Sequence, residues 1–108
     1  MRRGEVRWYA FRAPDKRRPV VILARDSAIR FLNALTVAPI TSTVRDIPTE
    51  VLLAREDGLP NECAVNLDNV QTVPKAHLGA LIARLSPERM GEIRRALAFA
   101  LGFDATTM

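Results

Sequence analysis

The sequence predicts one compact, mainly β domain that is closed by a C-terminal helix. Three observations support this: short segments rich in β-branched residues recur along residues 5–85, turn signals separate them, and only the last segment has a clearly capped helical pattern. With 108 residues, of which 48% are hydrophobic and 26% charged, the chain has the size and composition of a single globular domain spanning residues 1–108.

The stretch Lys16–Leu23 has the clearest strand pattern. Its first three residues are cations, followed by Pro19 and then four aliphatic residues, three of them β-branched. Such a run predicts a buried strand that begins at a proline, where the missing N–H does no harm. A rigid strand would hold the cations at the surface, as an anion site requires. The alternative is that these charges only keep the strand end soluble.

The remaining elements follow from the same patterns. We expect Asp26–Leu32 to form one or two helical turns, and Pro39 to interrupt its strand or place it at a sheet edge. Asp57-Gly58 and Pro60 indicate a turn. Besides residues 19–24, the predicted strands are 5–12, 35–43, 48–55, 64–67, 70–73 and 79–85.

The C-terminal segment is predicted to be an amphipathic helix. Ser86 is a suitable N-cap, Pro87 fits the first helical position, and Gly102 is a suitable end. The apolar residues Met90, Ile93, Leu97 and Leu101 recur at helical spacing. We interpret this stripe as core packing.

Positive charge is concentrated in the first third of the chain. Residues 1–30 contain nine cations and three acids, a net charge of +6, whereas the whole chain has +4. Arginine predominates, and its planar guanidinium suits bidentate contact with phosphate. This distribution predicts a local site for a phosphate-rich or acidic partner.

Other kinds of site have weak support. The sequence has one histidine and one cysteine, and no glycine-rich phosphate loop, so we expect neither a metal site nor a cofactor. We interpret Cys63 as a small buried hydrophobe and His77 as a turn residue, although a thiol nucleophile or a Ser–His–Asp arrangement is formally possible. The lone cysteine and the absence of a membrane-length apolar stretch predict a cytoplasmic protein that does not enter a membrane.

The most promising chemistry lies at two predicted strand ends. Arg18 begins one strand, and the hydroxyl run Thr41–Thr43 ends another. If both ends lie at the same mouth, a phosphate would meet a fixed guanidinium and hydroxyl donors. The alternative is that Thr41–Thr43 is only a strand passing into a turn.

Four motifs in order resemble the MazF/PemK family of toxin–antitoxin endoribonucleases. They are Gly4–Val6, RPVVIL at Arg18–Leu23, VAPITS at Val37–Ser42 and VNLDNVQTV at Val65–Val73, followed by the closing helix. The similarity extends from about Arg3 to Gly102. It implies a small SH3-like barrel, a homodimer, and metal-independent cleavage of RNA at short sequences.

The resemblance assigns catalytic roles to Arg18 and Thr41, with Ser42 lining the site. This chain departs from the family at Ala10, where an acidic residue is common, and in the short loop 12–17, which is usually longer and glycine-rich. That loop tends to cover the substrate groove, so its shortness bears on sequence preference. It also lacks the histidine that some members have there.

The implied reaction is attack of the RNA 2′-hydroxyl on the adjacent phosphate, which would spare DNA. Arg18 would donate to the non-bridging oxygens as charge builds up, and Thr41 would hold the phosphate. We expect Lys16, Arg17, Ser42 and Thr43 to bind RNA around it. No residue is assigned as the general base.

Two further expectations concern partners and a rival function. A basic groove on a dimer would attract an acidic flexible segment, and the resemblance identifies its owner as a cognate antitoxin. The alternative is a non-catalytic module, similar to the CcdB toxins that share this architecture, which inhibits a topoisomerase or binds nucleic acid.

Overall fold

The computed structural model describes residues 1–10 and 17–104, and its mainly β architecture with a C-terminal helix confirms the predicted fold class. The β-strands are β1 (Glu5–Ala10), β2 (Arg17–Ile22), β3 (Ala34–Thr41), β4 (Glu50–Leu53), β5 (Cys63–Asn66), β6 (Gln71–Pro74) and β7 (Leu78–Arg84). The α-helices are α1 (Asp26–Ile29) and α2 (Pro87–Leu101), and three short 3₁₀ turns are η1 (Arg55–Asp57), η2 (Leu67–Asn69) and η3 (Lys75–His77).

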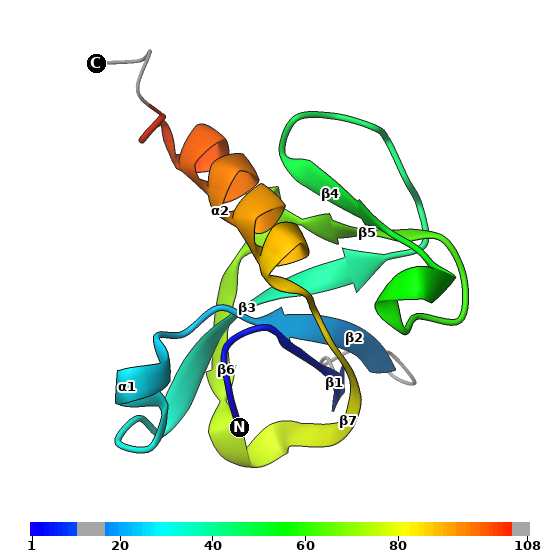
Figure 1. Ribbon diagram of the computed structural model, residues 1–108. Helices are drawn as coiled ribbons and strands as arrows, with labels where there is room; N and C mark the ends of the chain where they lie inside the picture. Colours follow the sequence, from blue (N-terminus) through cyan, green and yellow to red (C-terminus); the bar gives the residue numbers. More distant parts are fainter. Residues whose placement is uncertain (11–16, 105–108) are drawn as a thin grey trace.

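All seven strands belong to one antiparallel sheet that curls around itself (Figure 1). Its order is β4-β5-β3-β2-β1-β7, and β6 pairs with the first half of β3. Within the described chain the order stays open, with β4 and β7 at its ends, so strand pairing alone does not complete the predicted barrel. Helix α2 covers the β4 side and also contacts η2.

The two central strands β2 and β3 are buried on both faces. Val21 and Ala38 point into a core that α2 and β4 cover, whereas Val20, Ile22 and Val37 point into a second core beneath α1, β6 and β7. Successive side chains of a strand alternate between faces, so this division tells which face each residue occupies. The rim of the second core contains the candidate site.

Pro39 was predicted to interrupt its strand or to place it at a sheet edge, and the structure shows neither. β3 runs unbroken from Ala34 to Thr41 between β2 and the pair β5 and β6. On that second side β6 pairs as far as Val37 and β5 begins at Ile40. Pro39 therefore lies in the gap between two partner strands, where a missing N–H leaves no ladder bond unmade.

The segment 42–49 is a loop, which shortens two predicted strands at their facing ends. Its backbone is held by the buried carboxylate of Glu50, which accepts hydrogen bonds from the amides of Arg45 at 2.9 Å and Asp46 at 3.2 Å. Because this carboxylate organises the loop, neither strand can extend across residues 42–49.

Helix α2 has the predicted caps. The Ser86 hydroxyl accepts a hydrogen bond from the amide of Arg89, Pro87 occupies the first turn, and Gly102 ends the helix with a φ of 77°. Ile93, only 2% exposed, and Ala96 insert into the first core. This confirms the interpretation of the apolar stripe as packing, although Leu101 at its end is 58% exposed.

Arg89 ties α2 to η1. Its guanidinium lies 2.9 Å from the Asp57 carboxylate and 3.1 Å from Glu92. Burial by itself would raise the pKa of Asp57, but the hydrogen bonds from Arg89 and from the amide of Ala54 outweigh it and lower that pKa below its ordinary value. The ionised form of Asp57 therefore stabilises the folded state.

The fold predicts that Ile93→Ala lowers the free energy of unfolding by about 2–5 kcal/mol, because it leaves a cavity between α2 and the sheet. Denaturant unfolding measures this. The exposed neighbour Arg94→Ala serves as the control and should change stability by less than about 0.5 kcal/mol. Equal effects of the two substitutions would contradict the assigned packing of α2.

The lowered pKa of Asp57 predicts a pH-dependent stability difference between the wild type and Asp57→Asn. The wild type should be more stable at pH values above 3.8, the ordinary pKa, and the difference should shrink as the pH falls through the lower pKa of the folded state. Denaturant unfolding across this pH range measures the effect. A difference that stays constant down to the lowest pH would refute the ion pair's contribution.

Candidate functional site

Arg18 is the second residue of β2, at the end of the strand that extends beyond the second core. It shares a face of β2 with Val20 and Ile22, which have no exposed surface, so its backbone is held rigidly while its side chain is exposed. Tyr9 of β1 lies directly across from it. Among the described residues, no carboxylate forms an ion pair with Arg18, so its guanidinium can bind an external anion.

Thr41 ends β3 on the same face of the sheet, two residues after Pro39. Its Oγ1 accepts a hydrogen bond from the amide of Thr43 at 3.0 Å. Since a hydroxyl has one proton to donate and this contact uses only an oxygen lone pair, the Thr41 O–H can still donate to a ligand. The contact also shows that Thr41–Thr43 is a strand end passing into a turn, and binding of an anion by these hydroxyls stays a prediction.

Arg18 and Thr41 line one pocket of about 340 Å³, whose other lining residues are Pro39, Asn66, Asn69 and Gln71. The sequence analysis had predicted that the two strand ends would meet at one mouth, and this geometry brings them there. A single cation, one hydroxyl donor and three amides make a polar pocket suited to a phosphate with an uncharged polar group attached.

The three amide residues were missed as site residues. Asn66 ends β5, Asn69 belongs to η2 and Gln71 begins β6, so all three come from the stretch Val65–Val73 that was noted only as a motif. The available signal was the interleaving of amides with apolar residues in that stretch. Nothing in the linear sequence shows that this stretch passes beside β3.

Of the other predicted RNA-binding residues, the three that the structure describes do not line this pocket. Ser42 and Thr43 are exposed in the turn after β3. Arg17 lies on the opposite face of β2 by alternation and stacks over the ring of Trp8, with its guanidinium carbon 4.7 Å from the ring centroid. Lys16 lies outside the described residues. For all four, contact with RNA stays a prediction.

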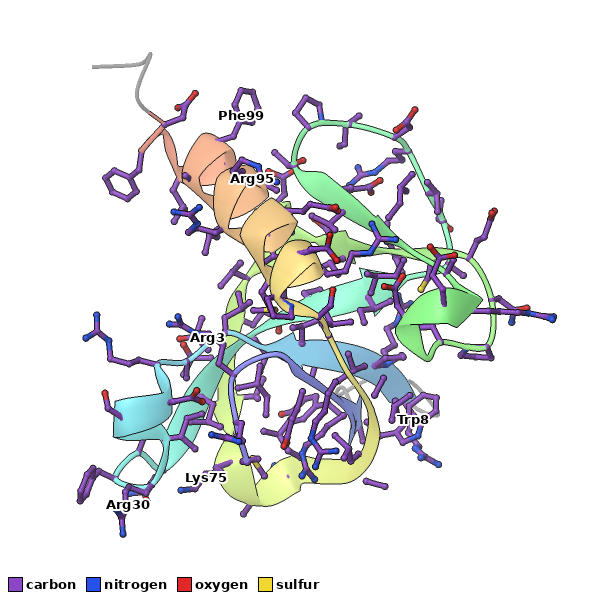
Figure 2. The ribbon with its side chains drawn as sticks, viewed as in Figure 1. Arg3, Trp8, Arg30, Lys75, Arg95 and Phe99 are labelled. Carbon is purple, nitrogen blue, oxygen red and sulfur yellow. The ribbon has the colours of Figure 1, made fainter. Side chains whose placement is uncertain are left out.

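The cations of the first third of the chain are spread over the surface. Figure 2 shows Arg30 on the side of the molecule opposite Trp8, and Arg3 between them. Arg3 is engaged locally, because its Nε donates to the carbonyl of Leu23 at 3.0 Å. Neither Arg3 nor Arg30 lines the pocket that contains Arg18.

The two residues with possible nucleophilic or acid–base chemistry lie elsewhere. Cys63 is buried, and burial, assisted by the negative charge of Asp57, raises the pKa of its thiol, which makes it a poor nucleophile. His77 is exposed in η3. Within residues 1–10 and 17–104, no three His, Cys, Asp or Glu side chains are close enough to hold a metal ion.

The fold and the pocket define a small curved antiparallel β domain in which an arginine and a threonine share a pocket at two strand ends. The sequence model of the PemK-like, MazF-like toxins of type II toxin–antitoxin systems matches residues 2–101. The chain belongs to this family.

Two relatives from Mycobacterium tuberculosis strain ATCC 25618 / H37Rv illustrate the likeness. A protein called "Probable endoribonuclease MazF5" is 45% identical over 100 residues, covering 92% of this chain and 91% of the relative. A second, called "Endoribonuclease MazF3", is 40% identical over 90 residues, covering 83% of this chain and 87% of the relative.

Solved structures extend the likeness to three dimensions. "Mycobacterium tuberculosis toxin MazF-mt6" has a TM-score of 0.85 at 36% identity and covers 93% of this chain and 98% of that chain. "Endoribonuclease in complex with its cognate antitoxin from Mycobacterial species" has a TM-score of 0.85 at 31% identity and covers 96% of this chain and 97% of that chain.

In the part of the chain that the structure describes, no helix is long and apolar enough to cross a membrane.

Proposed function

We propose that this chain is the toxin of a toxin–antitoxin pair and cleaves single-stranded RNA at specific short sequences without a metal ion or cofactor. The observation that carries this proposal is the meeting of Arg18 and Thr41 in one pocket. The relatives called endoribonucleases, which resemble this chain over most of its length, support it.

In the proposed reaction the RNA 2′-hydroxyl attacks the adjacent phosphate, and negative charge builds up on the non-bridging oxygens. Arg18 donates two hydrogen bonds to these oxygens from a fixed position, and Thr41 donates a third. Because both residues stand on strands that are packed into the second core, their backbones keep their positions as the charge develops. DNA lacks the attacking hydroxyl and is not cut.

Residues outside the pocket would hold the flanking nucleotides. Ser42 and Thr43 directly follow Thr41, and their hydroxyls can donate to a neighbouring phosphate. Lys16 and Arg17 directly precede Arg18 and add positive charge that makes RNA binding sensitive to salt. No general base is assigned, and among described residues the pocket lining contains neither a carboxylate nor an imidazole.

The proposed partner is a cognate antitoxin whose acidic flexible segment covers the site. A solved relative in complex with its antitoxin supports this.

We also propose a homodimer. Two apolar side chains at the end of α2, Phe99 (Figure 2) and Leu101, are exposed and support this proposal. We also propose a cytoplasmic location, which the proposed RNA substrate and the free Cys63 support.

The proposal predicts that Arg18→Ala lowers the rate of RNA cleavage about a hundredfold to a thousandfold, because it removes the main donor to the developing charge. Thr41→Val should also slow cleavage, since it keeps the side-chain shape but loses the hydroxyl. Cleavage of single-stranded RNA by the purified protein, with a chelator present, measures both.

Arg30→Ala is the matched control, because Arg30 is exposed on the side of the molecule opposite Trp8 and should not affect the rate. Cleavage that persists unchanged in Arg18→Ala would remove the site assignment. Failure of the wild type to cut any RNA would instead favour the non-catalytic module.

A further inference from the structure

We propose that Asn66, Asn69 and Gln71 form a subsite that reads one nucleobase next to the phosphate held by Arg18. The subsite would thereby contribute to the sequence at which RNA is cut. This inference rests on the proposed function, because it names what the same pocket binds beside the phosphate.

The three amides line the same pocket as Arg18 and Thr41, which stand at the ends of two strands. Gln71 pairs with Val37 of β3, and two residues later Val73 points into the second core. By alternation Gln71 therefore lies on the same face of the sheet as Arg18 and Thr41. A nucleotide whose phosphate contacts Arg18 consequently has its base within reach of the amides.

The turn η2, which presents Asn66 and Asn69, is held firmly. Leu67 is 1% exposed in the first core, and its amide donates to the carbonyl of Thr49 at 3.0 Å. The Thr49 hydroxyl donates to the carboxylate of Asp68 at 2.5 Å. Because the backbone of this turn is already ordered, binding costs little backbone entropy, which favours a subsite that discriminates between bases.

The hydrogen-bonding capacity of the amides remains largely available. The Asn66 Oδ1 accepts a hydrogen bond from the amide of Asp68 at 2.9 Å, which leaves its NH₂ group to donate into the pocket. The side chains of Asn69 and Gln71 form no hydrogen bond with other described residues. Each side chain offers an NH₂ group as donor and a carbonyl oxygen as acceptor. The edge of a nucleobase carries acceptors and donors that can pair with them.

The charges around the pocket favour a base over a second phosphate as the occupant of the amide side. Among the described lining residues, Arg18 carries the charge and the amides are neutral. A second phosphate would need another cation, whereas a neutral base needs matched donors and acceptors. Pro39 adds apolar surface against which a base ring can pack. The pocket volume of about 340 Å³ lies at the small end of the range for ligand pockets, about 300–1,000 Å³, and suits a single nucleotide.

Mapping cut ends in a randomised RNA pool tests the inference with Asn69→Ala and Gln71→Met, which remove an amide from the pocket. Each variant should still cut RNA but lose roughly tenfold to a hundredfold of its discrimination at one position beside the cut. Asn61→Ala is the control, because Asn61 is exposed outside the pocket and should not change the preference. Unchanged preference in both amide variants, or an equal loss of cleavage at all sequences, would overturn the subsite.

A second measurement uses the unmodified protein and so does not depend on how the variants fold. Short RNAs with 2′-O-methyl groups, which cannot be cut, are added in a series that differs at one base, and NMR follows the side-chain NH₂ signals of Asn69 and Gln71. Shifts that depend on the base support the subsite, even for a protein that proves unable to cleave RNA. Shifts that are the same for every base refute it, even if the protein cleaves RNA.

Discussion

Burial of β2 and β3 on both faces is the constraint on which the rest of the structure depends. Val21 and Ala38 fill one core while Val20 and Val37 fill the other, so a slip by one residue would move these side chains into the wrong core, which is packed for other residues. The fixed register then determines the face on which each strand-end residue stands. Arg18 is on the pocket side for this reason.

The same constraint explains how a small domain can hold a rigid polar pocket. The pocket continues the second core outward: buried aliphatic residues support its base, and Arg18, Thr41 and Gln71 follow them at alternate positions toward the rim. The strand that carries the guanidinium is already in place before an anion arrives. Such a support strengthens electrostatic stabilisation, because no free energy is spent on rearranging the backbone.

The first core supports the pocket from the other direction. Leu67 of η2 is buried there beside Ile93 of α2, so the packing of the C-terminal helix also positions the turn that presents Asn66 and Asn69. Arg89 strengthens this arrangement by binding Asp57 of η1. The helix therefore contributes to the site without contacting it, and the site depends on both cores.

Local patterns in the chain predict the class of fold and most of the elements, and they mark Arg18 and Thr41 as candidates for a site. Local physics suffices for these: alternation and β-branching mark strands, Ser86 and Gly102 mark the ends of α2, and a cation or hydroxyl at a strand end is visible in the chain. Only the tertiary structure decided that Pro39 lies inside the sheet, that Arg17 faces away from Arg18, and that three amides complete the pocket. These facts depend on which strands are neighbours, and pairing between distant segments leaves little trace in the linear sequence.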